Sequence, residues 1–129
     1  MSRYGISRKL ECGYDEAVER ARAALAKEGF GVLTEIDVKA VLKKKLDKDF
    51  RRYVILGACN PPLALKALTI ETEIGLMMPC NVIVYENDEG GATVSAVDPV
   101  VAMSMIDNPA LALAAKEVRE KLERVLQSL

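Results

Sequence analysis

The sequence of 129 residues contains no histidine and no tryptophan. Without histidine, a single chain cannot form a Ser-His-Asp triad, a Cys-His nucleophile pair or a histidine-ligated metal site. Only six aromatic residues are present, four Tyr and two Phe, so a surface for stacking nucleic-acid bases is poorly supplied. Eighteen basic and nineteen acidic residues give a net charge of -1, which excludes a globally basic protein but allows a local basic patch. We therefore do not expect nucleic acid as a partner.

Long apolar runs and targeting signals are also missing. No run approaches the roughly 18 apolar residues that a membrane span needs. Met1-Ser2-Arg3-Tyr4 is not followed by the apolar segment of a signal peptide. Three cysteines are too few for a disulfide framework, and an odd number fits a reducing compartment. We expect a cytoplasmic protein with no membrane partner, folded as a single domain over residues 1–129.

The most informative segment is an unbroken apolar run over residues 53–58, which ends in Cys59, Asn60 and two prolines. A run of this length and composition predicts a strand buried on both faces. Asn60 is a favoured helix N-cap, and Pro61 suits the first position of a helix. Cys59 is therefore expected at a strand-to-helix turn, beside free backbone N–H groups.

The rest of the pattern predicts an α+β fold, a mixed β-sheet packed against helices in the order β-α-β-α-β-α-β-β-α. Strands are expected over residues 4–12, 30–38, 53–58, 81–86 and 92–97, and helices over 15–28, 38–46, 61–69 and 109–129. Arg8 interrupts the first strand, which favours an edge position. Residues 87–91 contain the glycines of a hairpin loop.

A second Cys-Asn pair, Cys80-Asn81, follows two methionines and opens the next apolar run. A thiol at a helix N-terminus can serve as a nucleophile, a redox thiol or a soft-metal ligand, and two thiolates with thioethers suit Cu(I) better than zinc. The alternative for both cysteines is a small buried core residue. Parallel neighbouring strands would separate Cys59 and Cys80 by about 20 Å, whereas antiparallel strands or a partner subunit would bring them together.

Two groups of charged residues are further candidates. Glu35 and Asp37 alternate onto one side of the second strand, where they could share a proton or hold a hard cation, or simply be solvated. The only concentration of bases lies between residues 39 and 52, and it could bind phosphate or form a solvated helix face. Its members are Lys39, Lys43, Lys44, Lys45, Lys48, Arg51 and Arg52, interspersed with Asp47 and Asp49.

Several segments resemble the domain of unknown function 302 family. They are residues 29–39 (GFGVLTEIDVK), 55–61 (ILGACNP), 75–76 (GL) with 79–82 (PCNV), and 98–99 (DP), so the resemblance spans nearly the whole chain. It implies a small α+β domain that forms homodimers, and it implies no reaction. Many relatives carry histidine where this chain has Leu65, so the resemblance implies no histidine-based metal or acid–base role here.

Three hypotheses of function follow. The first is a dimeric domain that binds a small molecule or a soft metal; its ligand-binding candidates are Cys59, Asn60, Cys80, Asn81, Glu35 and Asp37, and its metal candidates Cys59 and Cys80. The second is a thiol-dependent enzyme or redox protein that uses Cys59; the sequence indicates no cofactor for it. The third is a structural or partner-binding module whose cysteines only pack. In that module a sheet edge or the last helix, through Leu122 or Val125, forms the dimer.

Overall fold

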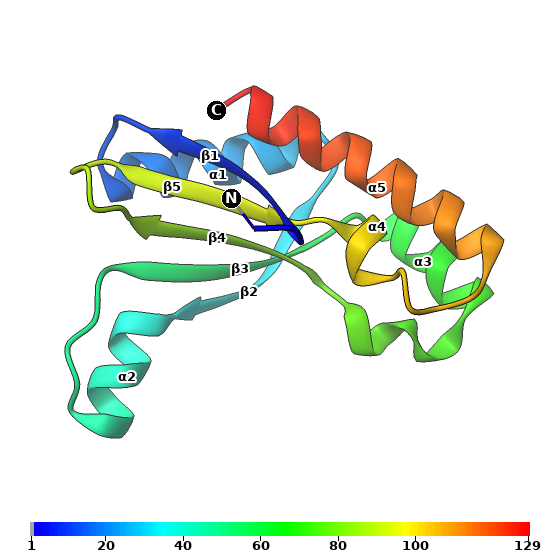
Figure 1. The fold of residues 1–129 in the computed structure, drawn as a ribbon, viewed down its shortest axis with the longest axis horizontal. Coiled ribbons are helices and arrows are strands. Elements are labelled where there is room, and N and C mark those ends of the chain that lie inside the picture. Colours follow the sequence, from blue (N-terminus) through cyan, green and yellow to red (C-terminus); the bar gives the residue numbers. More distant parts are fainter. Residues whose placement is uncertain (1) are drawn as a thin grey trace.

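A computed structural model describes residues 2–129. Five strands form one antiparallel sheet in the order β1-β5-β4-β3-β2 (Figure 1). The strands are β1 Gly5–Leu10, β2 Gly31–Asp37, β3 Tyr53–Cys59, β4 Cys80–Glu86 and β5 Ala92–Val97. The helices are α1 Tyr14–Lys27, α2 Val38–Leu46, α3 Pro61–Ile70, α4 Pro99–Ala102 and α5 Pro109–Gln127, with a 3-10 helix η1 at Thr72–Met77. The predicted α+β fold and order of elements are confirmed, with α4 and η1 as short additions. The sheet was expected to be mixed, but all four of its strand pairs are antiparallel.

One face of the sheet is covered by α1 and α5. Leu25 of α1 and Leu122 and Val125 of α5 are fully buried in one cluster with the inward side chains of the strands, among them Leu56 and Val84. Alanines on α1 let this helix approach the sheet closely. Since Leu122 and Val125 lie in the core of a single chain, the hypothesis that the dimer forms through these two residues is wrong.

The other face of the sheet is not covered by any helix of the described chain. On the central strand β3, Val54, Leu56 and Ala58 are buried, whereas Tyr53 and Ile55 on the opposite face are only half-buried. The expectation that β3 is buried on both faces is therefore wrong for one chain, because the second layer that such a strand needs is missing.

The edge strands end the sheet in different ways. β1 lies at one edge, as Arg8 indicated. The guanidinium Nη1 of Arg8 donates to the carbonyls of Leu126 and Gln127 at 3.1 and 2.9 Å. It thus provides a donor for carbonyl groups at the C-terminus of α5 that have no partner within the helix. β2 lies at the other edge and is irregular, since the register shifts between Val32 and Thr34. After this bulge, each side chain of β2 points to the side of the sheet opposite to the one that strict alternation from Val32 would give.

The strand β2 ends at Asp37, one residue before its expected end at residue 38, because the helix α2 begins at Val38. Asp37 caps this helix, since its side chain accepts from the backbone N–H of Ala40. None of the residues of α2 is buried. Figure 1 shows α2 extending away from the body of the domain, beyond the edge formed by β2. The helix is thus held mainly at its two ends.

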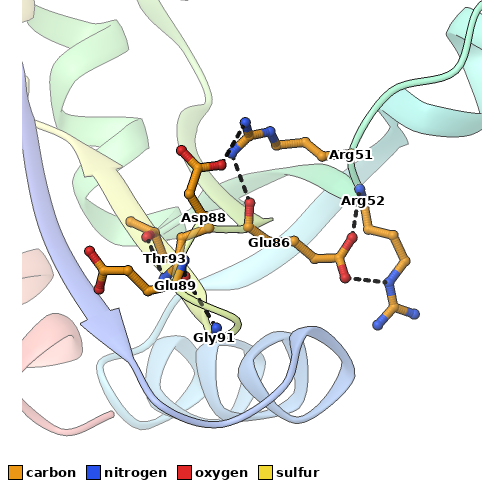
Figure 2. A network of polar contacts seen from close by, with 8 residues as sticks. Arg51, Arg52, Glu86, Asp88, Glu89, Gly91 and Thr93 are labelled. Atoms are coloured by element: carbon orange, nitrogen blue, oxygen red, sulfur yellow. Dashed lines mark hydrogen bonds and ion pairs between the residues drawn. The ribbon is translucent and has the colours of Figure 1, made fainter.

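The predicted hairpin loop 87–91 joins β4 and β5. Asn87 organises it: its Oδ1 accepts from the backbone N–H groups of Glu89 and Gly91 at 3.0 and 3.1 Å, and its Nδ2 lies 3.3 Å from the hydroxyl of Thr93 (Figure 2). The predicted start of the last helix is confirmed by Asn108, whose side chain accepts from the N–H groups of Ala110 and Leu111.

Candidate functional site

Antiparallel pairing of β3 and β4 brings the two Cys-Asn pairs to the same end of the sheet. Ala58 is the register partner of Cys80, so Cys59 is the residue next to the one directly opposite Cys80. The arrangement that would have separated the thiols by a strand length is excluded, and the antiparallel alternative holds. Strict alternation along β3 would direct Cys59 to the face opposite Ala58, yet Cys59 borders the cavity described below and lies close enough to Cys80 to raise the pKa of the Cys80 thiol.

A small cavity of about 40 Å³ lies at this end of the sheet, between β3, β4, α3 and α5. We call it the sulfur cavity, because four sulfur-containing side chains border it: Cys59, Met78, Cys80 and Met103. The remaining wall consists of Phe30, Ala58, Asn60, Leu63, Ala64, Ala67 and Val118. Apart from Asn60, every lining side chain is apolar or carries sulfur.

Burial raises the pKa of the Cys80 thiol from 9.0 to about 11, and the nearby Cys59 adds a smaller contribution of the same sign. Near neutral pH Cys80 is therefore a protonated, neutral thiol. Since the thiolate is the nucleophile in thiol chemistry, this environment does not favour Cys80 as an attacking group.

Both polar atoms of the Asn60 side chain form hydrogen bonds within the fold. Its Oδ1 accepts from the N–H of Leu63 at 3.4 Å, and its Nδ2 donates to the carbonyl of Glu28 at 3.2 Å, which ties the end of α1 to the start of α3. The first two positions of α3 are Pro61 and Pro62, which have no N–H group. The expectation of free backbone N–H groups beside Cys59 is therefore wrong: the first three positions of α3 leave no unpaired donor.

Asn81 does not join the sulfur cavity. It is exposed and borders a wide hollow of about 610 Å³ on the open face of the sheet, together with Ile83, Tyr85 and Ser95. The two asparagines of the Cys-Asn pairs thus lie in different environments, one inside the fold as a helix cap and one on the open sheet.

Glu35 and Asp37 also lie apart from the cavity, on β2. Glu35 pairs with Arg22 of α1 at 2.7 Å, and Asp37 is the cap of α2. Both carboxylates are exposed, and each has a structural partner. Nothing in this arrangement directs the two side chains at a common ligand.

The basic segment is anchored by its arginines. Arg51 Nη1 donates to the carbonyl of Glu86 at 3.0 Å, and its Nη2 lies 3.2 Å from Asp88 (Figure 2). Arg52 contacts Glu86 and Asp15 and lies over the ring of Tyr14 at 4.6 Å. These two arginines therefore hold the base of the segment to the hairpin and to α1. Among the lysines, Lys44, Lys45 and Lys48 form no ion pair within residues 2–129.

Gly57 and Asp98 each have a structural role outside the sulfur cavity. A Cβ added at Gly57 would lie 2.8 Å from Pro79 Cγ and would also meet Thr34, so glycine permits the chain before β4 to cross β3 closely. Asp98 is buried, caps α4 through the N–H groups of Val100 and Val101, and lies 3.3 Å from Arg119.

Met103 is the cavity residue that sequence reasoning missed. It follows the short helix α4, in a stretch without clear periodicity, and reaches the cavity beside α3.

Within residues 2–129, no three His, Cys, Asp or Glu side chains group as a metal-binding set. In the same range, no helix is long and apolar enough to cross a membrane.

The chain was compared with known families and structures. The family model described as "Domain of unknown function DUF302" matches residues 6–129. A solved structure, an uncharacterized conserved DUF302 protein from Bacillus stearothermophilus, superimposes with a TM-score of 0.91 at 30% sequence identity and covers 98% of each chain. No curated protein matches the chain. With its fold and nearly its whole length shared in this way, the chain belongs to the DUF302 family.

Proposed function

We propose that this domain binds a single soft metal ion, monovalent copper, in the sulfur cavity. The observation that supports this most is the gathering of sulfur. The chain has three cysteines and five methionines, and four of these eight residues border one cavity. Thiolate and thioether ligands select Cu(I) over harder cations.

The size of the cavity favours an ion over an organic ligand. Pockets for drug-sized molecules and cofactors have about 300–1,000 Å³, whereas the sulfur cavity has about 40 Å³. A space of this size holds a few heavy atoms. Of the two ligand classes that the sequence indicated, a small molecule and a soft metal, the metal fits better.

The chemistry of the wall argues against other metals. No carboxylate borders the cavity, and its one polar side chain, Asn60, is engaged at both ends by the backbone. Zinc in structural sites takes four Cys or His ligands, which are not available here. Two thiols and two thioethers are a donor set for Cu(I).

Binding would exchange the proton of Cys80 for the ion. The S–H bond of the thiol breaks, an S–Cu bond forms, and the proton leaves to solvent. Because the pKa of Cys80 is raised to about 11, the ion must displace a proton at any lower pH. Up to that pH, each increase of one pH unit makes the exchange tenfold more favourable. Met78 and Met103 would complete the coordination as neutral donors.

The test is a Cu(I) titration of the reduced protein in competition with a chromophoric chelator, without oxygen. We expect one equivalent of Cu(I) per chain, with Cys80→Ser abolishing binding. Met103→Leu, which keeps volume and removes only sulfur, should weaken binding by about tenfold or more, or about 1.4 kcal/mol. Cys59→Ser should have a smaller effect than Cys80→Ser, because Cys59 follows the register partner of Cys80 on β3 and strict alternation would direct its side chain to the other face of the sheet.

Cys12→Ser is the matched control. Cys12 is also partly buried, but it packs against the main core and does not border the sulfur cavity. Its substitution should leave copper affinity unchanged. Wild-type protein that takes up no stoichiometric Cu(I), or a Cys80→Ser variant that binds as the wild type does, would overturn the proposal.

A further inference from the structure

The methionines of this chain gather at one end of the molecule. Of the five, Met1 lies outside the described residues, and the others are Met77, Met78, Met103 and Met105. The first pair lies at the end of η1, and the second pair follows α4. All of them but Met105 pack against one small cluster of buried residues. The fold thus brings two segments that are distant in sequence together, where the chain after α4 passes η1 and α3 (Figure 1).

The exposure of these methionines increases from the cavity to the surface. Met78 and Met103 border the sulfur cavity and are half-buried, so each side chain reaches both the cavity and the protein surface. Met105 does not border the cavity and is 78% exposed. Methionine usually fills irregular gaps in a core, whereas Met105 presents its sulfur to solvent.

Met105 is held in an ordered turn beside Met103. The N–H of Ile106 donates to the carbonyl of Met103 at 3.0 Å. The N–H and the hydroxyl of Ser104 both donate to the carbonyl of Val101, at 3.2 and 2.7 Å. Two residues of chain span at most about 7 Å, and each methionine side chain has three rotatable bonds. The sulfur atoms of Met103 and Met105 can therefore approach each other without any movement of the backbone.

The two segments that carry the methionines have almost no charge. Residues 74–85 contain no charged side chain, and residues 99–115 contain only Asp107. Exposed apolar side chains are found there instead, among them Leu76 and Leu113, at 82% and 70%. Apart from Asp107, these segments offer a cation no charged donor, and their thioethers favour Cu(I).

A thioether and a thiol differ in what they must release when they bind the ion. Methionine sulfur is neutral and binds Cu(I) without losing a proton. Cys80 must lose one, and because burial raises its pKa to about 11, few molecules carry the thiolate near neutral pH. A methionine that binds the ion first would therefore separate capture of the ion from loss of the proton.

We infer that Met105 is the entry ligand of the sulfur cavity, which takes up Cu(I) at the surface and passes it through Met103 to Cys80. This inference rests on the proposed copper site. A bond forms between Cu(I) and the Met105 sulfur as the ligand that delivered the ion leaves, and it is then exchanged for a bond to the Met103 sulfur. Finally the S–H bond of Cys80 breaks, an S–Cu bond forms and the proton leaves to solvent. Met105 is not a ligand in the final complex.

A residue that binds the ion only in transit affects rates and not affinity. Capture and release pass through the same intermediate, so loss of the Met105 sulfur raises both barriers by the same amount. The Kd, which is the ratio of the two rate constants, stays the same. Met103 differs in this respect, because it is a ligand of the bound ion and its loss changes the Kd.

The test is stopped-flow transfer of Cu(I) from a chromophoric chelator to the reduced full chain, without oxygen. Release is measured by adding excess chelator to the loaded protein. Met105→Leu keeps the volume and removes only the sulfur, and because Met105 is exposed the core stays intact. We expect capture and release each to slow by about tenfold in this variant, with the Kd of the wild type. Met103→Leu should instead weaken the Kd.

Leu113→Ala is the matched control. Leu113 is an exposed apolar residue in the first turns of α5 and contains no sulfur, so its loss should leave both rates and the Kd unchanged. Wild-type rates in Met105→Leu, with one equivalent of Cu(I) still bound, overturn the inference and leave the copper site standing. A weaker Kd in Met105→Leu also overturns it, since Met105 would then be a ligand of the bound ion. A wild-type chain that takes up no Cu(I) overturns both the entry ligand and the copper site.

Discussion

The raised pKa of Cys80 leads to a quantitative prediction about its reactivity. At pH 8, a thiol with the ordinary pKa of 9.0 is ionised in about one molecule in ten, whereas a thiol with a pKa of about 11 is ionised in about one in a thousand. Alkylation proceeds through the thiolate. Cys80 in the native protein should therefore react about a hundredfold more slowly than in the unfolded chain, before any effect of restricted access.

The assay is iodoacetamide labelling of a Cys12→Ser/Cys59→Ser variant, in which Cys80 is the only thiol. Rates are measured from pH 7 to 11 in buffer and in denaturant. We expect the native rate to rise through the whole range, and the rate in denaturant to level off above pH 9. A native rate within tenfold of the denatured rate at pH 8, or a native profile that levels off near pH 9, would refute the reasoning.

The same shift affects stability. The folded state holds the Cys80 proton more tightly than the unfolded state, so this contribution is fully present below pH 9 and is lost as the pH rises through about 11. Two pKa units correspond to about 2.7 kcal/mol. The free energy of unfolding should fall by about this amount in total, in a decline that begins near pH 9 and is complete only above pH 11, and it should fall by less in a Cys80→Ala variant, which measures the part that other groups contribute.

Two further predictions concern residues with assigned structural roles. Asn60→Ala should lower the free energy of unfolding by about 1–2 kcal/mol, since it removes the cap of α3 and the bond to Glu28; urea denaturation measures this, and the exposed Asn81→Ala is expected to stay within about 0.5 kcal/mol of the wild type. An equal loss in both variants would contradict the assignment. Leu122→Asp should abolish cooperative thermal unfolding, because it buries an unpaired charge in the core, whereas Leu113→Asp on the exposed side of the same helix should unfold cooperatively. A folded Leu122→Asp chain would show that the core is placed wrongly.

Local sequence signals located most elements of this fold. The hairpin glycines, the cap at Asn108 and the alternation of β1 each lead to the observed element. They succeed because each depends on neighbours in sequence. The face assignments of β2 after Val32 could not be obtained in this way, since the bulge is a property of its pairing with β3.

The candidate site was predicted in part. Two thiols with nearby methionines were found as a group, but their approach depends on antiparallel pairing, which short-range patterns do not specify. Met103 comes from a distant segment and was missed for the same reason. The absence of donors beside Cys59, in contrast, was readable in the sequence: Pro61 and Pro62 have no N–H group, and Asn60 occupies the next one.

The apolar run of β3 indicated a strand covered on both faces, and the single chain covers only one. Patterns of hydrophobicity record every surface that is buried in the working protein, including surfaces buried between chains. The mismatch between the apolar run and the fold of one chain therefore identifies the open face of the sheet as a surface whose apolar composition the fold of one chain does not explain.

The central claim is that sulfur atoms alone would hold a metal in the cavity at the end of β3 and β4. X-ray absorption at the copper edge, on protein loaded with one equivalent of Cu(I), tests it most directly. The account predicts a first coordination shell made only of sulfur, and loss of the bound copper in Cys80→Ser. A shell containing nitrogen or oxygen, or the same spectrum in Cys80→Ser, would contradict it.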